Sequence, residues 1–245
     1  MAGHSKWANI KHRKGRQDAK RGKLFAKLIK SIESAARNGG PDIGANPTLA
    51  TAVQKAKDNS VPKDNIDRAI ARGAGDVDGV DYIEAFYEGY AAGGIALYVQ
   101  ILTDNRNRAA SDVRSTFAKN GGNLGEPGSV GYLFEQKGHI LASGDEDTVM
   151  MAALEGGAED VTADGVQWEV VTDPSDLQSV RSELEAADVV IESSDVTYLP
   201  TTSVPVDASG AAGVLRLVDA LEDLDDVQAV FANFDIPDEV FASLE

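Results

Sequence analysis

The sequence predicts an α+β protein in which an N-terminal three-helix domain precedes two α/β domains. Residues 18–73 place apolar side chains at helical spacing in three segments, whereas the chain from Val80 onward alternates short strands with amphipathic helices. The length of 245 residues is near the limit for a single hydrophobic core, which favours several domains. A sharp division of charge along the chain also separates its first 75 residues from the rest.

Three helices are expected in the helical domain, residues 18–75. The first stops at the pair Gly39-Gly40. The second begins at Asn46-Pro47, a capping residue followed by the residue favoured at the first helical position. The third begins near Pro62 and leads into the Gly- and Asp-rich stretch 73–81, which is interpreted as a linker.

From residue 80 the expected elements read βαβ, then βαββαβ, then βαβ. The middle six form a complete ferredoxin-like domain, and the outer halves form a second one when joined. We therefore expect two ferredoxin-like α/β domains, one inserted in the other, because insertion is tolerated where the ends of a loop lie together. The outer domain comprises residues 80–137 and 201–245, and the inserted domain comprises residues 138–200. The expected strands are 95–102, 129–134, 139–142, 159–163, 166–172, 189–198, 202–206 and 227–234, and the expected helices start near 105, 145, 174 and 211.

Charge is the most informative property of the sequence. The first thirty residues carry ten Lys and Arg and one acid, although the whole chain has a net charge of −17. The net charge is +10 up to Gly75 and −27 in the remainder. The N-terminal end of the chain is therefore expected to bind a polyanion, while the acidic remainder after Gly75 repels one.

The basic N-terminal arm, residues 1–17, is the main candidate for a nucleic-acid site. Lys and Arg neutralise phosphates and release counterions, and an aromatic side chain stacks on an unpaired base. Trp7 has two interpretations, base stacking or docking on the protein itself. The candidate nucleic-acid-binding residues in the arm and the helix that follows it are Lys6, Trp7, Lys11, His12, Arg13, Lys14, Arg16, Lys20, Arg21 and Lys23.

A second basic cluster opens the helix expected after residue 105. Arg106 and Arg108 lie in its first turn, where positive charge opposes the helix dipole. Two interpretations follow: the arginines form a second anion contact for nucleic acid, or they form salt bridges within the protein.

Motifs for catalysis or metal binding are missing from the sequence. The chain has no Cys, its three His show no metal-ligand spacing, and no GxSxG elbow occurs. The loop GGNLGEPG lacks the Lys-Ser/Thr of a phosphate-binding loop, and we interpret it as a turn that needs positive φ. We therefore expect a protein that is not an enzyme, with no catalytic residues, no metal, no cofactor and no small-molecule substrate. No apolar run of about 18 residues predicts a membrane span.

The chain resembles the YebC/PmpR family in four ordered motifs that cover essentially its whole length. They are MAGHSKWANIKHRKGRQDAKRGKLFAKL, NPTLATAVQKAKDNSVPKDNIDRAIARGAG, LTDNRNRAASDVR and GGNLGEPGSVGYLF. The mitochondrial relatives of that family are translational activators of cytochrome oxidase. The resemblance implies a non-enzymatic, cytoplasmic bacterial protein with a helical N-terminal domain and two α/β domains. Members are regarded as transcriptional regulators that bind DNA, or act on the ribosome and relieve stalls at proline-rich stretches.

Two functions therefore remain open, and both have nucleic acid as the partner. In the first, the chain is a ribosome-associated, RNA-binding translation factor, because a narrow basic arm on an acidic body suits a crowded RNA cleft. In the second, it is a DNA-binding transcriptional regulator, although the sequence shows no helix-turn-helix recognition helix.

Overall fold

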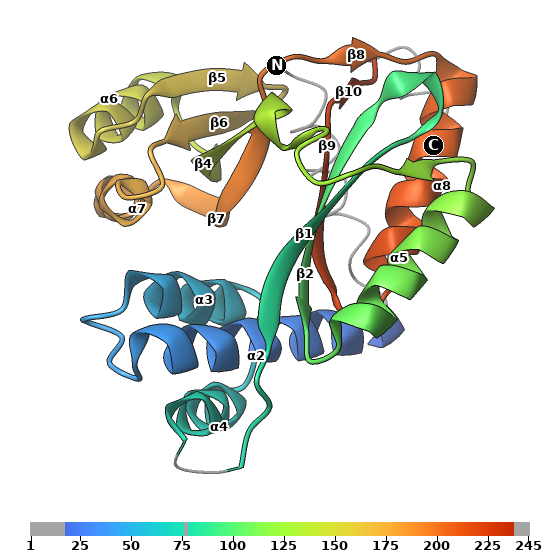
Figure 1. Ribbon diagram of the computed structural model, residues 1–245. Coiled ribbons are helices and arrows are strands. Elements are labelled where there is room, and N and C mark those ends of the chain that lie inside the picture. Colours follow the sequence, from blue (N-terminus) through green and yellow to red (C-terminus); the bar gives the residue numbers. More distant parts are fainter. Residues whose placement is uncertain (1–17, 76–77, 238–245) are drawn as a thin grey trace.

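The computed structural model describes residues 18–75 and 78–237. Three helices form the helical domain, and two antiparallel four-stranded sheets form the cores of the outer and inserted domains. The helical and inserted domains lie on one side of the outer sheet, while α5 (Arg106–Lys119) and α8 (Ala208–Glu222) cover its other side (Figure 1). The predicted fold class, α+β with a three-helix N-terminal part followed by α/β parts, is confirmed.

The helical domain consists of α2 (Asp18–Gly39), α3 (Pro47–Asp58) and α4 (Lys63–Ala74). The side chain of Asn46 caps α3 by accepting the backbone N–H of Leu49 at 3.1 Å, and Pro47 occupies the first helical position. The three helices pack around an apolar cluster that includes Leu28, Ile32, Leu49, Val53 and Ile66.

Helix α4 crosses α2 closely at Gly73. A Cβ at this position would overlap the carbonyl oxygen of Glu33 and lie 2.6 Å from the Cβ of Ala36. We expect Gly73→Ala to lower the free energy of unfolding by about 1–3 kcal/mol, because the two helices must separate to admit the methyl group. The control is Gly22→Ala in α2, where a Cβ meets no atom within 4 Å. Urea denaturation should show the control unchanged or stabilised by up to about 1 kcal/mol, since Ala is the better helix former. Equal effects of the two substitutions would contradict the packing argument.

The stretch after α4, which the composition predicts as a linker, is bonded to the helical domain in its described part. The buried carboxylate of Glu33 accepts the backbone N–H of Val80 at 3.0 Å and the Nε of Arg72 at 3.0 Å. Arg37 forms an ion pair with Asp81 at 2.8 Å. Residues 78–81 therefore follow a path along α2.

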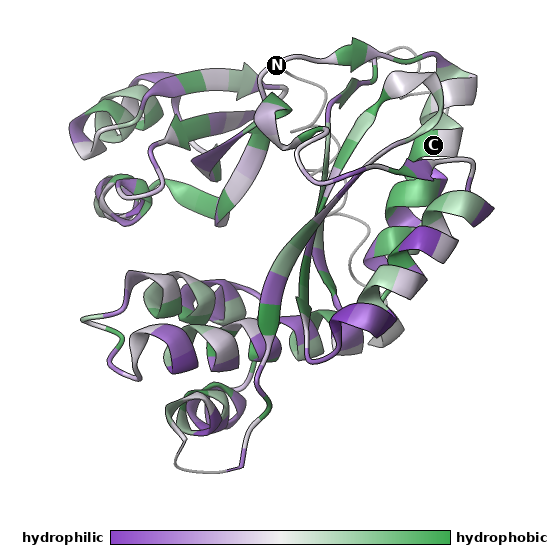
Figure 2. Cartoon of the chain, viewed as in Figure 1, coloured by the Kyte–Doolittle hydropathy of each residue, from purple (hydrophilic) through white to green (hydrophobic). Residues whose placement is uncertain are grey.

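The outer domain begins with a hairpin that the sequence analysis missed. Its elements are β1 (Ile83–Tyr90), β2 (Ala96–Thr103), α5, β3 (Asn123–Leu124), α8 and β9 (Val227–Ala232), with the 3₁₀ turn η1 (Ala92–Gly94) in the hairpin. The sheet order is β3-β1-β2-β9, and all pairs are antiparallel. The first half therefore runs ββαβ, where βαβ was expected. Figure 2 shows the hydrophobic residues of β2 and α8, which share one buried cluster with α5.

The inserted domain shows the expected βαββαβ order. Its elements are β4 (Phe134–Ser143), α6 (Glu146–Gly156), β5 (Asp160–Asp164), β6 (Gln167–Thr172), α7 (Leu177–Ala186) and β7 (Val190–Pro200). The strands are arranged β5-β6-β4-β7, which is the antiparallel order of a ferredoxin-like sheet. Helices α6 and α7 pack on one face of this sheet.

The predicted strand 129–134 is wrong. Residues 131–133 form a 3₁₀ turn, η2 (Gly131–Leu133), and β4 begins only at Phe134. The reason is the carboxylate of Glu88 on β1, which accepts the backbone N–H groups of Gly128, Val130 and Gly131 at 2.6–2.7 Å. With these donors directed at one side chain, the segment cannot form a strand ladder. The predicted strand 202–206 is likewise reduced to the pair β8 (Val204–Pro205), which lies parallel to β10 (Phe234–Asp235).

An aromatic cluster joins the outer and inserted domains. Tyr98 of β2 lies between Phe86 of β1, with ring centroids 4.5 Å apart, and Phe134 of β4, at 5.7 Å. Tyr198 of β7 lies edge-on to Tyr98 at 5.3 Å and contacts Phe231 of β9 at 5.1 Å. These residues pack on the face of the outer sheet opposite α5 and α8.

Candidate nucleic-acid interface

The candidate residues fall into three groups in the structure. Seven of them, Lys6, Trp7, Lys11, His12, Arg13, Lys14 and Arg16, lie outside the described residues. Lys20, Arg21 and Lys23 belong to the first turns of α2, and Arg106 and Arg108 belong to the first turn of α5. The arm leads into α2, whose N-terminal half carries three of the five described candidate residues.

Helix α2 presents a row of lysines to the C-terminal end of α8. Lys23 Nζ lies 3.1 Å from the carbonyl oxygen of Asp223, and Lys27 Nζ lies 2.6 Å from that of Glu222. Lys30 Nζ lies 3.1 Å from the carbonyl oxygen of Asp225. Lys23 and Lys27 thus donate to carbonyls at the negative end of the α8 dipole, a stabilising arrangement, and Lys30 donates to the loop that follows the helix.

Lys27 and Lys30 were not among the candidate residues predicted from the sequence. Lys23, Lys27 and Lys30 are spaced by four and three residues, so they share one face of α2. This spacing was visible in the sequence and was the signal that could have identified them.

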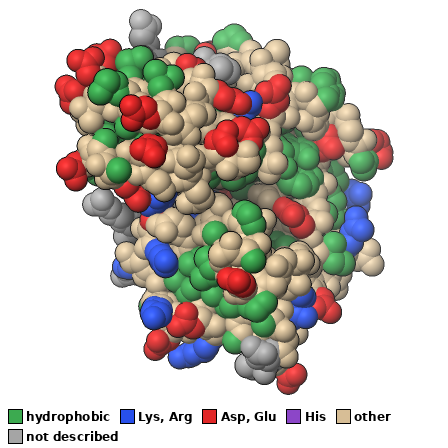
Figure 3. Space-filling view, turned by 90° about the vertical axis from the view of Figure 1, so that its left-hand side faces the viewer, with side chains coloured by type: hydrophobic (Ala, Val, Ile, Leu, Met, Phe, Trp, Pro, Cys, Tyr) green, Lys and Arg blue, Asp and Glu red, His purple; other side chains and the backbone are tan. Residues whose placement is uncertain are grey.

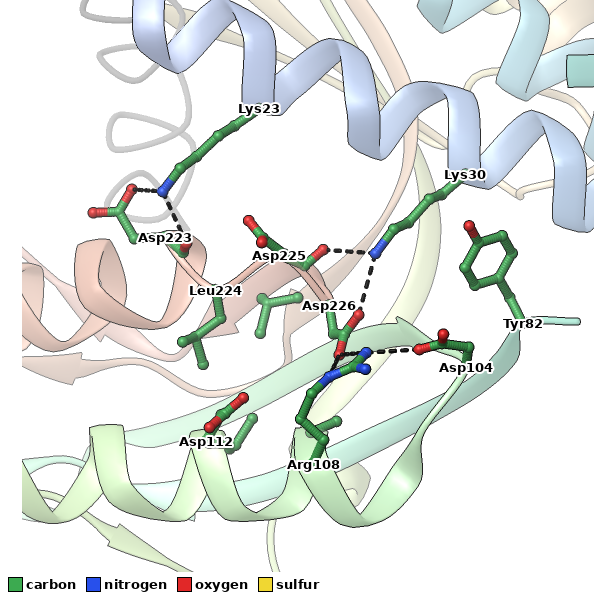
Figure 4. A pocket seen from close by; sticks show the side chains of 13 residues that line it. Lys23, Lys30, Tyr82, Asp104, Arg108, Asp112, Asp223, Leu224, Asp225 and Asp226 are labelled. Carbon is green, nitrogen blue, oxygen red and sulfur yellow. Dashed lines mark hydrogen bonds and ion pairs between the residues drawn. The ribbon is translucent and has the colours of Figure 1, made fainter. Parts of the chain in front are cut away.

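Asp226, just after α8, connects three elements. Its carboxylate accepts hydrogen bonds from Lys30 at 3.1 Å, from the Thr103 hydroxyl at 2.9 Å and from Arg108 Nη2 at 2.7 Å (Figure 4). Burial alone would raise the pKa of Asp226, but the hydrogen bonds from these three donors outweigh it and lower that pKa. The carboxylate therefore remains ionised at neutral pH.

The sequence left two interpretations of Arg108, an anion contact or a salt bridge within the protein. In the structure Arg108 forms salt bridges within the protein. Its guanidinium binds Asp226 and also Asp104, the latter at 2.7 Å. Hydrogen bonds to Asp226 and then to Asp104 raise the pKa of Arg108. This pairing offsets the unfavourable position of the arginine at the start of α5. Arg106 is exposed, as Arg108 is, and its backbone carbonyl accepts the Tyr87 hydroxyl at 3.3 Å.

The two arginines should respond differently to substitution. We expect Arg108→Gln to lower the melting temperature, because Asp226 loses its shortest contact, while Arg106→Gln leaves the melting temperature unchanged within about 2 °C. If Arg106 contacts phosphate, Arg106→Gln weakens RNA binding about two- to fivefold, the effect of one phosphate contact. Thermal denaturation and filter binding of each single variant provide the measurement. Unchanged RNA affinity of Arg106→Gln would remove Arg106 from the candidate site.

An open cleft of about 640 Å³ lies between α2 and the adjoining ends of α5 and α8 (Figure 4). Lys23, Lys30 and Arg108 line it together with several carboxylates, and the Nζ of Lys30 lies 5.5 Å from the centroid of the Tyr82 ring. The cations in this cleft are thus already paired with acidic groups of the same chain.

The far side of the helical domain meets the inserted domain through further ion pairs. The guanidinium of Arg181 on α7 contacts Asp58 at 2.7 and 3.1 Å. Lys55 on α3 binds Asp195 of β7 at 2.9 Å. Exposed cations also remain on the helical domain, and they include Arg21, Lys57, Lys63 and Arg68.

The glycine-rich loop is a braced structural turn. The three N–H groups that a phosphate would need point instead at the carboxylate of Glu88, and Gly128 has a φ of 88°. The Tyr90 hydroxyl further holds the loop by donating to the carbonyl oxygen of Ser129 at 2.8 Å. Elsewhere, the ring of His139 lies 2.7 Å from the carboxylate of Glu169. Among the described residues, no cluster of three or more His, Asp or Glu side chains could hold a metal ion.

Two family models match this chain. The TACO1/YebC protein N-terminal domain matches residues 5–76, and the TACO1/YebC second and third domain matches residues 82–234. The chain belongs to the TACO1/YebC family. The boundary between the two matches falls where α4 ends and β1 begins.

Relatives in the TACO1/YebC family match the chain over its full length. A protein of Acidothermus cellulolyticus is 57% identical and one of Thermobifida fusca is 56% identical, each over 100% of both chains, and both are named "Probable transcriptional regulatory protein". The crystal structure of a conserved hypothetical protein from Aquifex aeolicus is 47% identical, with a TM-score of 0.85 over 95% of this chain and 97% of that one. Among the described helices of this TACO1/YebC chain, none has the length and apolar character needed to cross a bilayer.

Proposed function

We propose that this chain is a non-enzymatic, nucleic-acid-binding regulator of gene expression. It acts in translation, as an RNA-binding factor on the ribosome that relieves stalls at proline-rich stretches. The proposal draws on family membership for the class of function and on the distribution of charge for the kind of target. Its working site is the basic arm together with the N-terminal half of α2.

The division of charge is the observation that carries this proposal. The first thirty residues hold ten Lys and Arg, while the part of the chain after Gly75 has a net charge of −27. In Figure 3, Asp and Glu side chains gather over the upper half, where the inserted domain lies, and Lys and Arg lie mainly over the helical domain below. Contact with phosphates is therefore favourable only over a small part of the surface. A small basic surface can insert into an RNA cleft, whereas binding along a duplex would need a broad basic face.

Binding to duplex DNA is the second candidate function. The names of the relatives, "Probable transcriptional regulatory protein", favour it. The acidic outer and inserted domains oppose it, because they would repel the phosphates that flank any site contacted by the arm.

Co-sedimentation distinguishes the two functions. The full chain should sediment with ribosomal particles at a salt concentration that already releases it from mixed-sequence duplex DNA. The DNA-binding alternative predicts the opposite order, and association with ribosomes weaker than that with duplex DNA at every salt concentration would refute the translational proposal.

A further inference from the structure

The helical domain is attached to the rest of the chain differently from the way the other two domains are attached to each other. An aromatic cluster around Tyr98 and Tyr198 joins the outer and inserted domains. The apolar cluster of the helical domain, in contrast, contains only residues between Leu24 and Ile70. The described contacts that join this domain to the α8 end and to the inserted domain are hydrogen bonds and ion pairs. Domains joined by polar interfaces move relative to each other more readily than those joined by apolar ones.

The α8 end offers the lysines of α2 the same chemistry as a phosphate backbone. Lys23, Lys27 and Lys30 bind five oxygens of residues 222–226. These are the carbonyls of residues 222, 223 and 225 and the carboxylates of Asp223 and Asp226. The last carbonyls of a helix lack partners within it and carry partial negative charge. Three carbonyl oxygens with partial negative charge and two carboxylates thus lie along the ammonium groups of α2.

We infer that the lysine face of α2, formed by Lys23, Lys27 and Lys30, is part of the RNA-binding site, and that the α8 end occupies this face until RNA displaces it. This inference rests on the proposed function. The phosphates of an RNA strand replace the carbonyl and carboxylate oxygens, and the helical domain separates from the outer domain. Because Lys23, Lys27 and Lys30 follow one another at four- and three-residue spacing on α2, one RNA strand then contacts all three ammonium groups.

Asp226 makes this release possible without a large penalty. When Lys30 leaves, the carboxylate keeps its hydrogen bonds to Arg108, at 2.7 Å, and to Thr103, at 2.9 Å. A buried carboxylate that lost all of its donors would strongly oppose opening, because an unpaired buried charge is very unfavourable. Arg108 therefore stabilises the outer domain in both the closed and the open arrangement.

Distance measurements between two labels test the inference directly. The chain has no native Cys, so Asp67→Cys on α4 and Ser111→Cys on α5, both exposed, give one labelled pair. A single-stranded RNA of about 20 nucleotides, long enough for the six or so contacts expected, serves as the probe. We expect the distance between the labels to increase when RNA saturates the protein, and an unchanged distance with RNA bound would overturn the inference while leaving the proposed function intact.

Charge-neutralising variants provide the second arm of the test. Asp223→Asn with Asp226→Asn should lengthen the label distance without RNA and tighten RNA binding about three- to tenfold, as expected for the loss of two competing ion pairs. The matched control, Glu146→Gln with Glu155→Gln on α6, changes the net charge equally at exposed positions of the inserted domain. If the control variant gained as much affinity for RNA as Asp223→Asn with Asp226→Asn, the gain would be a general effect of net charge, and the inference would be overturned.

A milder variant guards against misfolding of the Asp226 substitution. The variant combines Asp223→Asn, which removes the carboxylate partner of Lys23, with Gln228→Ala, which removes the amide that lies 3.2 Å from the Ser31 hydroxyl. It keeps the buried carboxylate of Asp226. We expect the same direction of change in distance and affinity, and no change in either would count against the inference. If no variant and no wild-type protein binds RNA, the proposed function itself fails.

Discussion

Deletion of residues 1–16 should abolish most of the affinity for RNA, at least about a hundredfold at moderate salt. Six or so phosphate contacts give a slope near −4 to −5 in a plot of log affinity against log salt, and removal of the arm should flatten that slope to about −1 to −2. The arm holds five of the ten Lys and Arg of the first thirty residues and Trp7. Filter binding over a range of salt concentrations measures both quantities.

A control separates the arm from charge in general. Lys57→Gln with Lys63→Gln removes two exposed cations from α3 and α4. This variant should lose no more than about threefold in affinity, because the cations contribute only to the long-range field. The arm hypothesis fails if the truncated chain binds RNA as tightly as the intact one.

Substitution of Glu88 should have the largest effect on stability. The carboxylate is buried in β1 and accepts three backbone N–H groups of the loop around Gly128. Glu88→Gln places an amide donor against these donors, and we expect the free energy of unfolding to fall by about 2–4 kcal/mol. The control is Glu84→Gln on the same strand, where the side chain is exposed and the expected change is within about 0.5 kcal/mol.

The pH dependence of the Glu88 effect has a definite sign. Burial alone would raise the pKa of Glu88, but the three backbone hydrogen bonds lower it below its ordinary value of 4.5. A carboxyl group with a lowered pKa stabilises the fold above its unfolded-state pKa, and this contribution disappears as the pH falls through the folded-state value. The difference in stability between wild type and Glu88→Gln should therefore be full at pH 7 and shrink below about pH 4.5. A difference that grows on acidification would show that the carboxylate is not the stabilising species.

The fold could be predicted from the sequence where one local signal dominates. Helical spacing, the Asn46 cap and the terminal glycines predicted the three helices, and regular alternation predicted the six elements of the inserted domain. The hairpin strand β1 was missed because Glu84 and Glu88 interrupt its apolar pattern. The apolar residues of 129–134 predict a strand, but no sequence pattern shows that the carboxylate of Glu88 binds the backbone N–H groups of Val130 and Gly131.

The candidate site was only partly predictable for a similar reason. Composition identifies the basic arm, and spacing could have added Lys27 and Lys30. The sequence also suggested that Arg108 had either an anion or a salt bridge as its partner, but the choice depended on Asp226, 118 residues further along the chain. Contacts of this separation follow from tertiary packing and leave no local pattern.

The lysine contacts of α2 also set an order of events during biosynthesis. Lys23, Lys27 and Lys30 precede their partners on the α8 end by 195 to 200 residues. At about 5–20 residues per second, the ribosome needs about 10–40 s to complete that interval. The helical domain, with its own apolar core, is therefore made and able to fold while its cations still lack their acidic partners. The emerging chain is therefore strongly basic at first, with a net charge of +10 at Gly75. It reaches neutrality at Asp160 and becomes increasingly acidic as the rest is added.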